Sequence, residues 1–255
     1  LDVGVSGKNC YYLPEYNTPE EYEANIGDLT NVFSEIGGDI LFVVGGSGNV
    51  SGGVLRLLEQ LKHCNISVLY IQPNISMLGE KRTQQERLVY YILQEYARSG
   101  LFERLYLVSN LHVEDIIGGA PIMGYHEKLN ETIVSTLHMI NVFDHTRAVI
   151  GKSERPHETA RISTFGISNL DGDKKLFFPL DNQREIKYYY GINMRVLETD
   201  QELYKKITKQ VQNEEIKTSH GIYSTEYDDP YVYCVVHSSQ IQYREEEKKS
   251  LHLSV

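Results

Sequence analysis

The chain has 255 residues, of which 41% are hydrophobic and 24% are charged, and its net charge is −10. This length is sufficient for one large α/β domain or two small domains with a real hydrophobic core, and the acidic balance argues against a protein that coats nucleic acid. No apolar run approaches the ~20 residues that span a bilayer, and residues 1–4 do not begin a secretory signal, so we expect a cytoplasmic protein without membrane insertion.

The first predicted helix spans residues 19–36. Thr18 is a suitable N-cap, Pro19 occupies the first helical position, and acidic residues follow in the first turn. Gly37 and Gly38 are expected to end this helix.

The next segment alternates between predicted strands and helices. An apolar run at residues 39–44 predicts a strand that is buried on both faces of a parallel sheet. A glycine-rich loop at residues 45–53 follows it. Further along, the patterns predict a helix at 54–61, a strand at 67–72, a helix at about 83–98, a strand at 105–108 and a helix at 125–140. This alternation is typical of a doubly wound, parallel α/β sheet.

The pattern changes after residue 150, and we expect a smaller α+β domain there. A poorly patterned stretch surrounds the turn at residues 171–173. The predicted elements are a strand at 159–167, a helix at 200–213, and strands at 222–224 and 231–236.

The glycine-rich loop is the candidate ligand site. It has five glycines within residues 45–53 and lies between a predicted strand and a predicted helix. Glycines let backbone N–H groups approach an anion closely, and the start of a helix favours negative charge. Ser47, Asn49 and Ser51 offer further donors. The loop therefore predicts a phosphate site, and the alternative is a tight strand–helix turn without a ligand.

Two common nucleotide motifs fit this loop poorly. A Walker-type loop ends in Gly-Lys-Ser/Thr, and this loop contains no lysine. The glycines at 46, 48 and 52 loosely imitate a dinucleotide-binding turn, but Gln72 and Asn74 stand where the acidic residue after the next strand is expected. A dinucleotide-dependent oxidoreductase is therefore a less favoured alternative.

Residues 39–61 resemble the phosphate-binding unit of the FtsZ/tubulin superfamily of filament-forming GTPases. In that family a loop of the form Gly-Gly-x-Gly-x-Gly follows a strand and opens a helix. This chain departs from the family at Asn49-Val50-Ser51, where Thr-Gly-Ser/Thr-Gly is commoner. The resemblance implies that the nucleotide binds to Gly45, Gly46, Ser47, Gly48, Asn49, Val50 and Ser51.

Two shorter segments extend the resemblance. Residues 78–86 are similar to the family's Glu-Gly-x-x-Arg-x-x-Gln/Ala-x-Glu stretch, with Leu78 in place of the first Glu. Arg82 fills the position of the arginine that reaches the nucleotide, although without the resemblance it would be read as a solvated arginine at a helix start. Residues 7–9 resemble the family's Gly-x-Gly-x-Asn loop, which implies that Asn9 approaches the terminal phosphate.

Residues 125–136 resemble the start of the family's long central helix. The resemblance implies that the ring of Tyr125 stacks on the guanine base and that the amide of Asn130 reads the guanine edge. An aromatic ring suits a purine face. Because the chain has 19 tyrosines, a surface tyrosine without this role is the alternative for Tyr125.

This chain departs most from the family in the segment that corresponds to the catalytic loop. FtsZ carries Asn-x-Asp-x-x-Asp after the central helix, and its acids help to activate water against the nucleotide of the next subunit. In residues 141–147 the two acid positions hold Phe143 and Thr146, or, with one insertion, Asp144 and Arg147. Asp144 and His145 are the candidates for orienting water, with a helix cap and a surface residue as alternatives. We expect slow hydrolysis or altered chemistry.

The resemblance does not cover the whole family pattern. The family has a strand and another glycine-rich loop upstream, so either these precede residue 1 or the protein is a minimal variant. Residues 155–163 resemble the tubulin entry into the smaller domain, and beyond residue 170 the match rests on element order. The expected organisation is a nucleotide-binding domain at 1–124, a central helix and catalytic-type loop at 125–150, a C-terminal α+β domain at 151–243 and a charged tail at 244–255.

The expected function is therefore that of a GTP-binding, self-assembling cytoskeletal protein, with GTP or GDP and Mg²⁺ as ligands. A head-to-tail contact of this kind gives an open filament. The first alternative is a non-hydrolysing protein with the same fold. The tail is expected either to recruit a partner or to be a solvated end. Because Cys10, Cys64 and Cys234 lack metal-ligand spacing, we expect reduced thiols and no metal site built from protein ligands.

Overall fold

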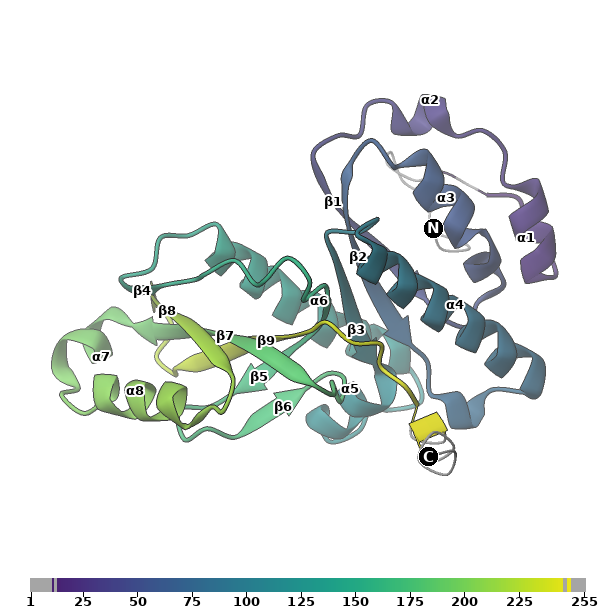
Figure 1. Ribbon diagram of the computed structural model, residues 1–255. Helices are drawn as coiled ribbons and strands as arrows, with labels where there is room; N and C mark the ends of the chain where they lie inside the picture. Colours follow the sequence, from purple (N-terminus) through teal and green to yellow (C-terminus); the bar gives the residue numbers. More distant parts are fainter. Residues whose placement is uncertain (1–10, 12, 245–246, 249–255) are drawn as a thin grey trace.

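The computed structural model describes residues 11, 13–244 and 247–248. Figure 1 shows two lobes that share one sheet: β1–β3 and α1–α4 lie in the first lobe, and β4–β9 with α7 and α8 lie in the second. The strands follow the order β1-β2-β3-β5-β9-β7-β8-β4, and β6 pairs with β5 outside this path.

The first lobe follows the predicted alternation of strands and helices, and α6 leads from it into the second lobe (Figure 1). Its elements are α1 (Pro19–Asn25), α2 (Thr30–Phe33), β1 (Asp39–Gly45), η1 (Asn49–Gly53), α3 (Val54–Gln60), β2 (Asn65–Gln72), η2 (Ile75–Met77), α4 (Glu80–Ser99), β3 (Arg104–Ser109), α5 (Asn110–Ile117) and α6 (Tyr125–Asp144).

The second lobe is built mainly from strands. Its elements are β4 (Ile150–Lys152), β5 (Ile162–Ser168), β6 (Lys174–Leu176), β7 (Gln183–Asn193), α7 (Met194–Thr199), α8 (Leu203–Asn213), β8 (Lys217–Thr225) and β9 (Tyr231–Ser238). β9 runs antiparallel to both β5 and β7, whereas β7 and β8 are parallel.

The two lobes meet at a short strand pairing. β1, β2 and β3 are parallel, and each pairs over most of its length. β3 lies beside β5 and pairs with it in parallel at two positions, Leu105 with Ile162 and Tyr106 with Ser163. The sheet is thus continuous but narrow at this junction, so other contacts must help to fix the two lobes relative to each other.

The single helix predicted for residues 19–36 is wrong. α1 begins as expected, because the side chain of Thr18 accepts the N–H of Glu21 at 3.2 Å and the Glu21 carboxylate accepts the Thr18 N–H. It ends at Asn25, because Ile26 adopts an extended conformation. After Gly27 the chain starts a second, short helix, α2, and the periodic pattern of apolar residues did not reveal this break.

The prediction that residues 39–44 are buried on both faces is also wrong. β1 is the edge strand of the sheet in the described part of the chain. Leu41 and Val43, on one of its faces, are 45% and 54% exposed. The apolar run gave the strand but not its position in the sheet, because an edge strand and a central strand of a parallel sheet have the same composition.

The central strand of the second lobe, β7, lies in the stretch that has no clear pattern in the sequence. Its middle residues, Ile186–Ile192, are all buried. The tyrosines at 188, 189 and 190 alternate between the two faces of the sheet and are each no more than 1% exposed. A run of tyrosines has no hydrophobic alternation, which explains why the strand was missed. The short elements α5, β4, β6 and α7 were not predicted either.

Hydrophobic residues fill both sides of the sheet. One cluster lies against α3, α4 and α8, and includes Leu58, Leu93, Tyr188 and Ile207. The second cluster lies against α5 and α6, and is centred on Leu129, Ile133, Phe143, Phe165 and Tyr189. The burial of these apolar surfaces is the main stabilising contribution to the fold. Among the described helices, none is both long and apolar enough to cross a bilayer.

A C-terminal strap, residues 239–244, returns from β9 to the first lobe. The segment runs from β9 across the lobe junction toward α4 in Figure 1. The Tyr90 hydroxyl donates to the carbonyl of Gln242 at 2.7 Å, and the Gln242 N–H donates to the Gln94 side chain at 2.7 Å. These contacts hold α4 against the end of the second lobe.

The sequence places Arg244 at the start of a charged tail, but its side chain is only 13% exposed and is paired with α4. Its guanidinium forms an ion pair with Glu86, which is fully buried in α4, and lies over the ring of Tyr90. The Glu86 carboxylate also accepts the hydroxyl of Tyr70 at 2.7 Å. The strap therefore carries the charge that balances a buried carboxylate. Residues 245–246 and 249–255 of the predicted tail lie outside the described residues.

Replacing Glu86 by alanine should lower the free energy of unfolding by about 3 kcal/mol, because removing one partner leaves the other buried charge uncompensated. Urea denaturation of the purified protein measures this change. The control is Glu131→Ala, which breaks the exposed pair of Lys128 and Glu131 at 3.1 Å and should change the free energy by less than about 1 kcal/mol. Equal, small effects of the two substitutions would contradict the role of the buried pair.

Candidate functional site

The glycine-rich loop leaves the carboxyl end of β1. The N–H of Gly46 donates to the carbonyl of Ile71 at 3.0 Å, which continues the pairing of β1 and β2 by one residue. The chain then turns and enters η1, which leads directly into α3. Open parallel sheets bind their ligands at the carboxyl ends of the strands, so the loop lies where a ligand is expected.

The five glycines of the loop have two different physical roles. A Cβ on Gly46 would collide with the Tyr70 hydroxyl, one on Gly52 with the carbonyl of Pro19, and one on Gly53 with Ile26. These three glycines allow close internal packing. A Cβ on Gly45 or Gly48 would meet no atom of the described residues within 4 Å. The open positions are therefore those at which a ligand can approach the backbone.

The loop offers unused backbone donors. Among the described residues, no backbone carbonyl accepts the N–H of Ser47, Asn49 or Val50. The Asn49 side chain donates to the carbonyl of Asn17 at 2.8 Å, which fixes the turn against the segment before α1. Unpaired N–H groups that point out of a turn form a concavity suited to an anion.

Basic side chains from α4 stand beside these donors. Lys81 and Arg82, in the first turn of α4, line a cavity of about 470 Å³ together with Ser47 and Asn49. Glu20 of α1 lines the same cavity. The structure thus brings together three residues predicted from the sequence, Ser47, Asn49 and Arg82. Of the other predicted loop residues that the structure describes, Gly45, Gly46, Gly48, Val50 and Ser51 do not line this cavity.

The loop lies directly on the buried carboxylate of Glu86. A side chain at position 46 would meet both the Tyr70 hydroxyl and the Cγ of Glu86. Burial raises the pKa of Tyr70 well above its usual range, so the hydroxyl keeps its proton and donates to Glu86. The loop therefore rests on the hydrogen bond between Tyr70 and Glu86 and on the ion pair between Glu86 and Arg244.

The predicted base-binding residues lie apart from the cavity. Tyr125 begins α6, and its hydroxyl donates to the Glu114 carboxylate at 2.6 Å. This hydrogen bond, with partial burial, raises the pKa of Tyr125 to about 12. Asn130 is exposed on α6. Their roles stay predictions, and Asn9 lies outside the described residues.

The candidate catalytic residues lie at the other end of the sheet. α6 has 20 residues, so its length of about 30 Å separates Tyr125 from Asp144. Asp144 lies near the amino ends of β1, β2 and β3, in a cavity lined also by Asp39 and Ser67. In one chain Asp144 and His145 are therefore remote from the glycine-rich loop, and only a second copy could bring them to it.

Asp144 has three partners within its own chain. Its Oδ1 atom accepts hydrogen bonds from Lys187 at 3.1 Å, Tyr189 at 2.9 Å and Ser153 at 3.2 Å. The Nδ1 atom of His145 lies 2.8 Å from the carbonyl of Asn141. Oδ2 of Asp144 and Nε2 of His145 are the atoms that remain for orienting water.

Phe143, which occupies one of the two candidate acid positions, has a structural role. Its side chain is buried and stacks on Tyr223 with a centroid distance of 4.5 Å. Tyr189 and Tyr231 stack on it as well. Phe143 therefore anchors the end of α6 on the sheet of the second lobe, and Asp144 is the first residue after this anchor that faces outward.

Sequence analysis missed a polar cluster near Asp144. His237 on β9, Ser163 on β5 and Arg104 on β3 lie side by side, with the Ser163 hydroxyl 2.8 Å and an Arg104 nitrogen 3.0 Å from Nδ1 of His237. These residues are 59 to 133 positions apart in the chain. No local sequence motif predicts this cluster, because its residues become neighbours only through the pairing of β3, β5 and β9.

No family model matches the chain, and no curated protein matches it in sequence. Solved structures match its fold. TubZ of Bacillus thuringiensis serovar israelensis, in a GTPγS-form protofilament, gives a TM-score of 0.59 at 14% identity, over 85% of this chain and 68% of its own. CetZ2 of Haloferax volcanii, in a GTPγS-bound protofilament, gives 0.60 at 15% identity, over 85% and 69%. An FtsZ dimer of M. jannaschii gives 0.55 at 13% identity, over 87% and 67%.

The chain spans about two thirds of the length of the structures it matches, between 64% and 69%. At sequence identities of 13–16%, these structural matches show a shared fold. The chain thus has a divergent form of the FtsZ/tubulin fold, which confirms the fold class predicted from the strand, glycine-rich loop and helix of residues 39–61.

The two roles of the glycines predict different effects of alanine. Gly46→Ala should lower the free energy of unfolding by about 1–3 kcal/mol, because its Cβ overlaps the Tyr70 hydroxyl. Gly45→Ala is the matched control and should stay within about 0.5 kcal/mol of the unmodified protein. Thermal and urea unfolding measure both. If the neighbouring substitutions were equally tolerated, the packing of Gly46 on Tyr70 would be wrong.

His237 should make stability depend on pH. Burial, followed by the charges of Arg104 and Lys187, holds the pKa of His237 well below its ordinary value of 6.5. Below that ordinary value the unfolded chain takes up a proton that the folded chain does not, so stability is lost as the pH falls toward the folded pKa. His237→Gln should reduce the slope by up to about 1.4 kcal/mol per pH unit.

Urea unfolding at about pH 7.5 and about pH 5.5 measures this slope. The exposed His126 provides the control variant His126→Gln, which should keep the slope of the unmodified protein. Parallel pH profiles for the unmodified protein and His237→Gln would show that His237 is not held neutral by the fold.

Proposed function

We propose that this protein binds a guanine nucleotide at its glycine-rich loop and assembles head-to-tail into filaments. The observation that carries the proposal is the cavity in which Ser47 and Asn49 meet Lys81 and Arg82. Unpaired backbone donors and two cations are the groups that bind phosphate oxygens. The shared fold supports the nucleotide, because matching TubZ structures are GTPγS-form and GDP-form protofilaments.

The residues of the loop have distinct roles in this proposal. The N–H groups of Ser47 and Asn49 bind phosphate oxygens, and Gly48 leaves room for them to approach. Arg82 neutralises phosphate charge from the start of α4. Mg²⁺ bound with the nucleotide would lower the charge repulsion between its phosphates, and Glu20 is the carboxylate in this cavity that would hold it. Tyr125 and Asn130 remain the residues proposed to contact the base.

The geometry of the two ends supports self-assembly. The residues proposed to act on water and those proposed to bind phosphate lie at opposite ends of the chain, so a hydrolytic site would require Asp144 and His145 of one copy beside the loop of the next. A repeating contact of this kind is heterologous and continues into a filament. The protofilament arrangements of the matching TubZ and CetZ2 structures support this proposal.

A second candidate is a filament protein that binds the nucleotide without hydrolysing it. The surroundings of Asp144 favour it, because Lys187, Tyr189 and Ser153 all bind Oδ1. These three hydrogen bonds tie the carboxylate to its own chain and leave Oδ2 as the oxygen that can contact water. Nucleotide turnover distinguishes this candidate from the first.

Arg82→Gln should weaken GTP binding by about tenfold, because it removes a charge-assisted hydrogen bond to phosphate. Gly48→Ala should weaken binding without loss of stability. The control is Arg56→Gln, which removes the same charge from an exposed position on α3, where Arg56 lies 3.8 Å from Glu59. Affinities are measured by isothermal titration with GTP, and with NAD as the competing ligand.

The same full-length protein tests assembly and turnover. Phosphate release that rises more than linearly with protein concentration, together with GTP-dependent light scattering, is the result expected for a site completed between copies. Scattering without phosphate release would favour the non-hydrolysing candidate. If Arg82→Gln and Arg56→Gln bound GTP equally well, or if NAD and not GTP bound, the proposed nucleotide site would be wrong.

A further inference from the structure

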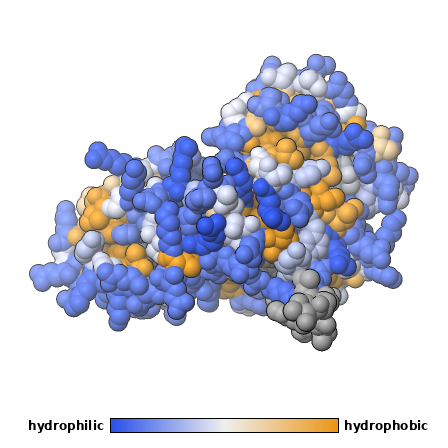
Figure 2. Space-filling model, viewed as in Figure 1, coloured by the Kyte–Doolittle hydropathy of each residue, from blue (hydrophilic) through white to orange (hydrophobic). Residues whose placement is uncertain are grey.

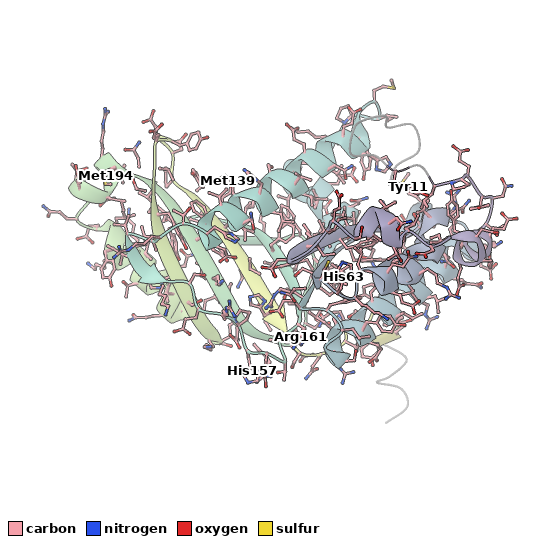
Figure 3. The ribbon with its side chains drawn as sticks, turned by 90° about the horizontal axis from the view of Figure 1, so that it is seen from above. Tyr11, His63, Met139, His157, Arg161 and Met194 are labelled. Atoms are coloured by element: carbon pink, nitrogen blue, oxygen red, sulfur yellow. The ribbon has the colours of Figure 1, made fainter. Side chains whose placement is uncertain are left out.

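A second, larger cavity lies at the end of the sheet opposite to the glycine-rich loop. It encloses about 1120 Å³ between the first residues of β1, β2 and β3 and the segment of residues 144–158. Arg161, which also lines it, lies at the junction of the two lobes in Figure 3, close to His157. Within one copy the cavity lies away from the glycine-rich loop, because α6 separates the two ends, although Asp144 and His145, which are proposed to face the loop of the next copy, also line it.

His237 lines this cavity, and two neighbouring residues determine its tautomer. Nδ1 of His237 lies 3.0 Å from Nη1 of Arg104 and 2.8 Å from the hydroxyl of Ser163. A guanidinium can only donate hydrogen bonds, so Nδ1 must be the acceptor. The depressed pKa of His237 keeps the ring neutral. The ring proton is therefore on Nε2.

This Nε2–H group is a donor without an acceptor. His237 is 3% exposed, and its Nε2 atom has no hydrogen-bond partner within the described part of the chain. A buried donor without an acceptor destabilises the fold, because it has lost its hydrogen bond to water. Lys187, whose charge acts on the ring, is itself a donor and cannot supply the missing bond.

The charges around the cavity favour a negative ligand. Six Arg and Lys residues and five Asp and Glu residues line it, whereas the whole chain has a net charge of −10. Lys187 Nζ donates to Asp144 at 3.1 Å and keeps two further donors. Arg104 has no carboxylate within ion-pair distance among the described residues. The wall of this cavity thus combines the cations Lys187 and Arg104 with the neutral Nε2–H donor of His237.

We propose that this cavity binds a small anion that carries a phosphate or carboxylate group. Oxygen atoms of the ligand accept hydrogen bonds from Nε2 of His237 and from Nζ of Lys187. Arg104 acts as a positioning residue, because its bond to Nδ1 places the ring proton on Nε2. Such a ligand supplies the missing acceptor and balances the excess of cationic donors. The proposal is independent of nucleotide binding at the glycine-rich loop.

Nuclear magnetic resonance of the full-length protein labelled with ¹⁵N-histidine tests the proposal. The signals of His237 are assigned by their loss in His237→Gln. The Nε2–H tautomer should be present without any added ligand. Inorganic phosphate, pyrophosphate and citrate serve as probes, and at least one of them should shift the Nε2 signal of His237 to saturation.

Two variants and one control identify the donors. Lys187→Gln should weaken binding of the active probe about tenfold, and Arg104→Gln should also change the tautomer of His237, which a purely structural role would not predict. Arg56→Gln removes the same charge elsewhere and should leave both properties unchanged. GTP binding should be equal in all three variants, which separates this site from the nucleotide site.

The competing occupant is a water molecule in a void of about 10 Å³ that His237 and Lys187 also line. A void of this size can hold one water. In that case none of the three anions would shift the Nε2 signal to saturation, and this result would overturn the proposal. Binding that is unchanged in Lys187→Gln would overturn the assigned donor set.

Discussion

The ion pair between Glu86 and Arg244 is the interaction on which the rest of the structure depends. Glu86 is fully buried under the glycine-rich loop, where it also accepts the hydroxyl of Tyr70. A buried carboxylate is tolerated when a charge and hydrogen bonds balance it. Arg244 comes from the far end of the chain, so the C-terminal strap, the long helix α4 and strand β2 meet at one point. The glycine-rich loop therefore packs on a buried ion pair whose arginine comes from the C-terminal strap.

Two groups of polar residues lie at opposite ends of the sheet, and the length of α6 separates them. Backbone donors, Lys81 and Arg82 gather at the carboxyl ends of the parallel strands, and Asp144 with His237 and Arg104 gather at the amino ends. On the face that Figure 2 shows, most of the surface is hydrophilic, with apolar residues gathered in places over both lobes. A chain with its proposed phosphate site at one end and its candidate acid at the other is suited to act in a row of copies.

The sequence predicted the strand–loop–helix unit and the long central helix well, because each of these depends on neighbouring residues. It placed Ser47, Asn49 and Arg82 in one site, and the structure brings them to one cavity. It was less successful where a residue's role depends on its position in the sheet. The same apolar composition serves an edge strand and a central strand, so the exposed face of β1 was not foreseen. The tyrosines of β7 lack the alternation that marks a strand.

The sequence by itself determined the order of the elements, the glycine-rich turn and the resemblance to a fold, since local propensity and short motifs are written in consecutive residues. The tertiary structure decided which glycines serve packing and which leave room for a ligand, because contacts with Tyr70, Pro19 and Ile26 distinguish them. It also decided that Arg244 pairs with the buried Glu86 and that the charges of Arg104 and Lys187 act on His237. Such roles arise between residues that are far apart in the chain, where sheet register and burial, and not local pattern, fix the neighbours of each side chain.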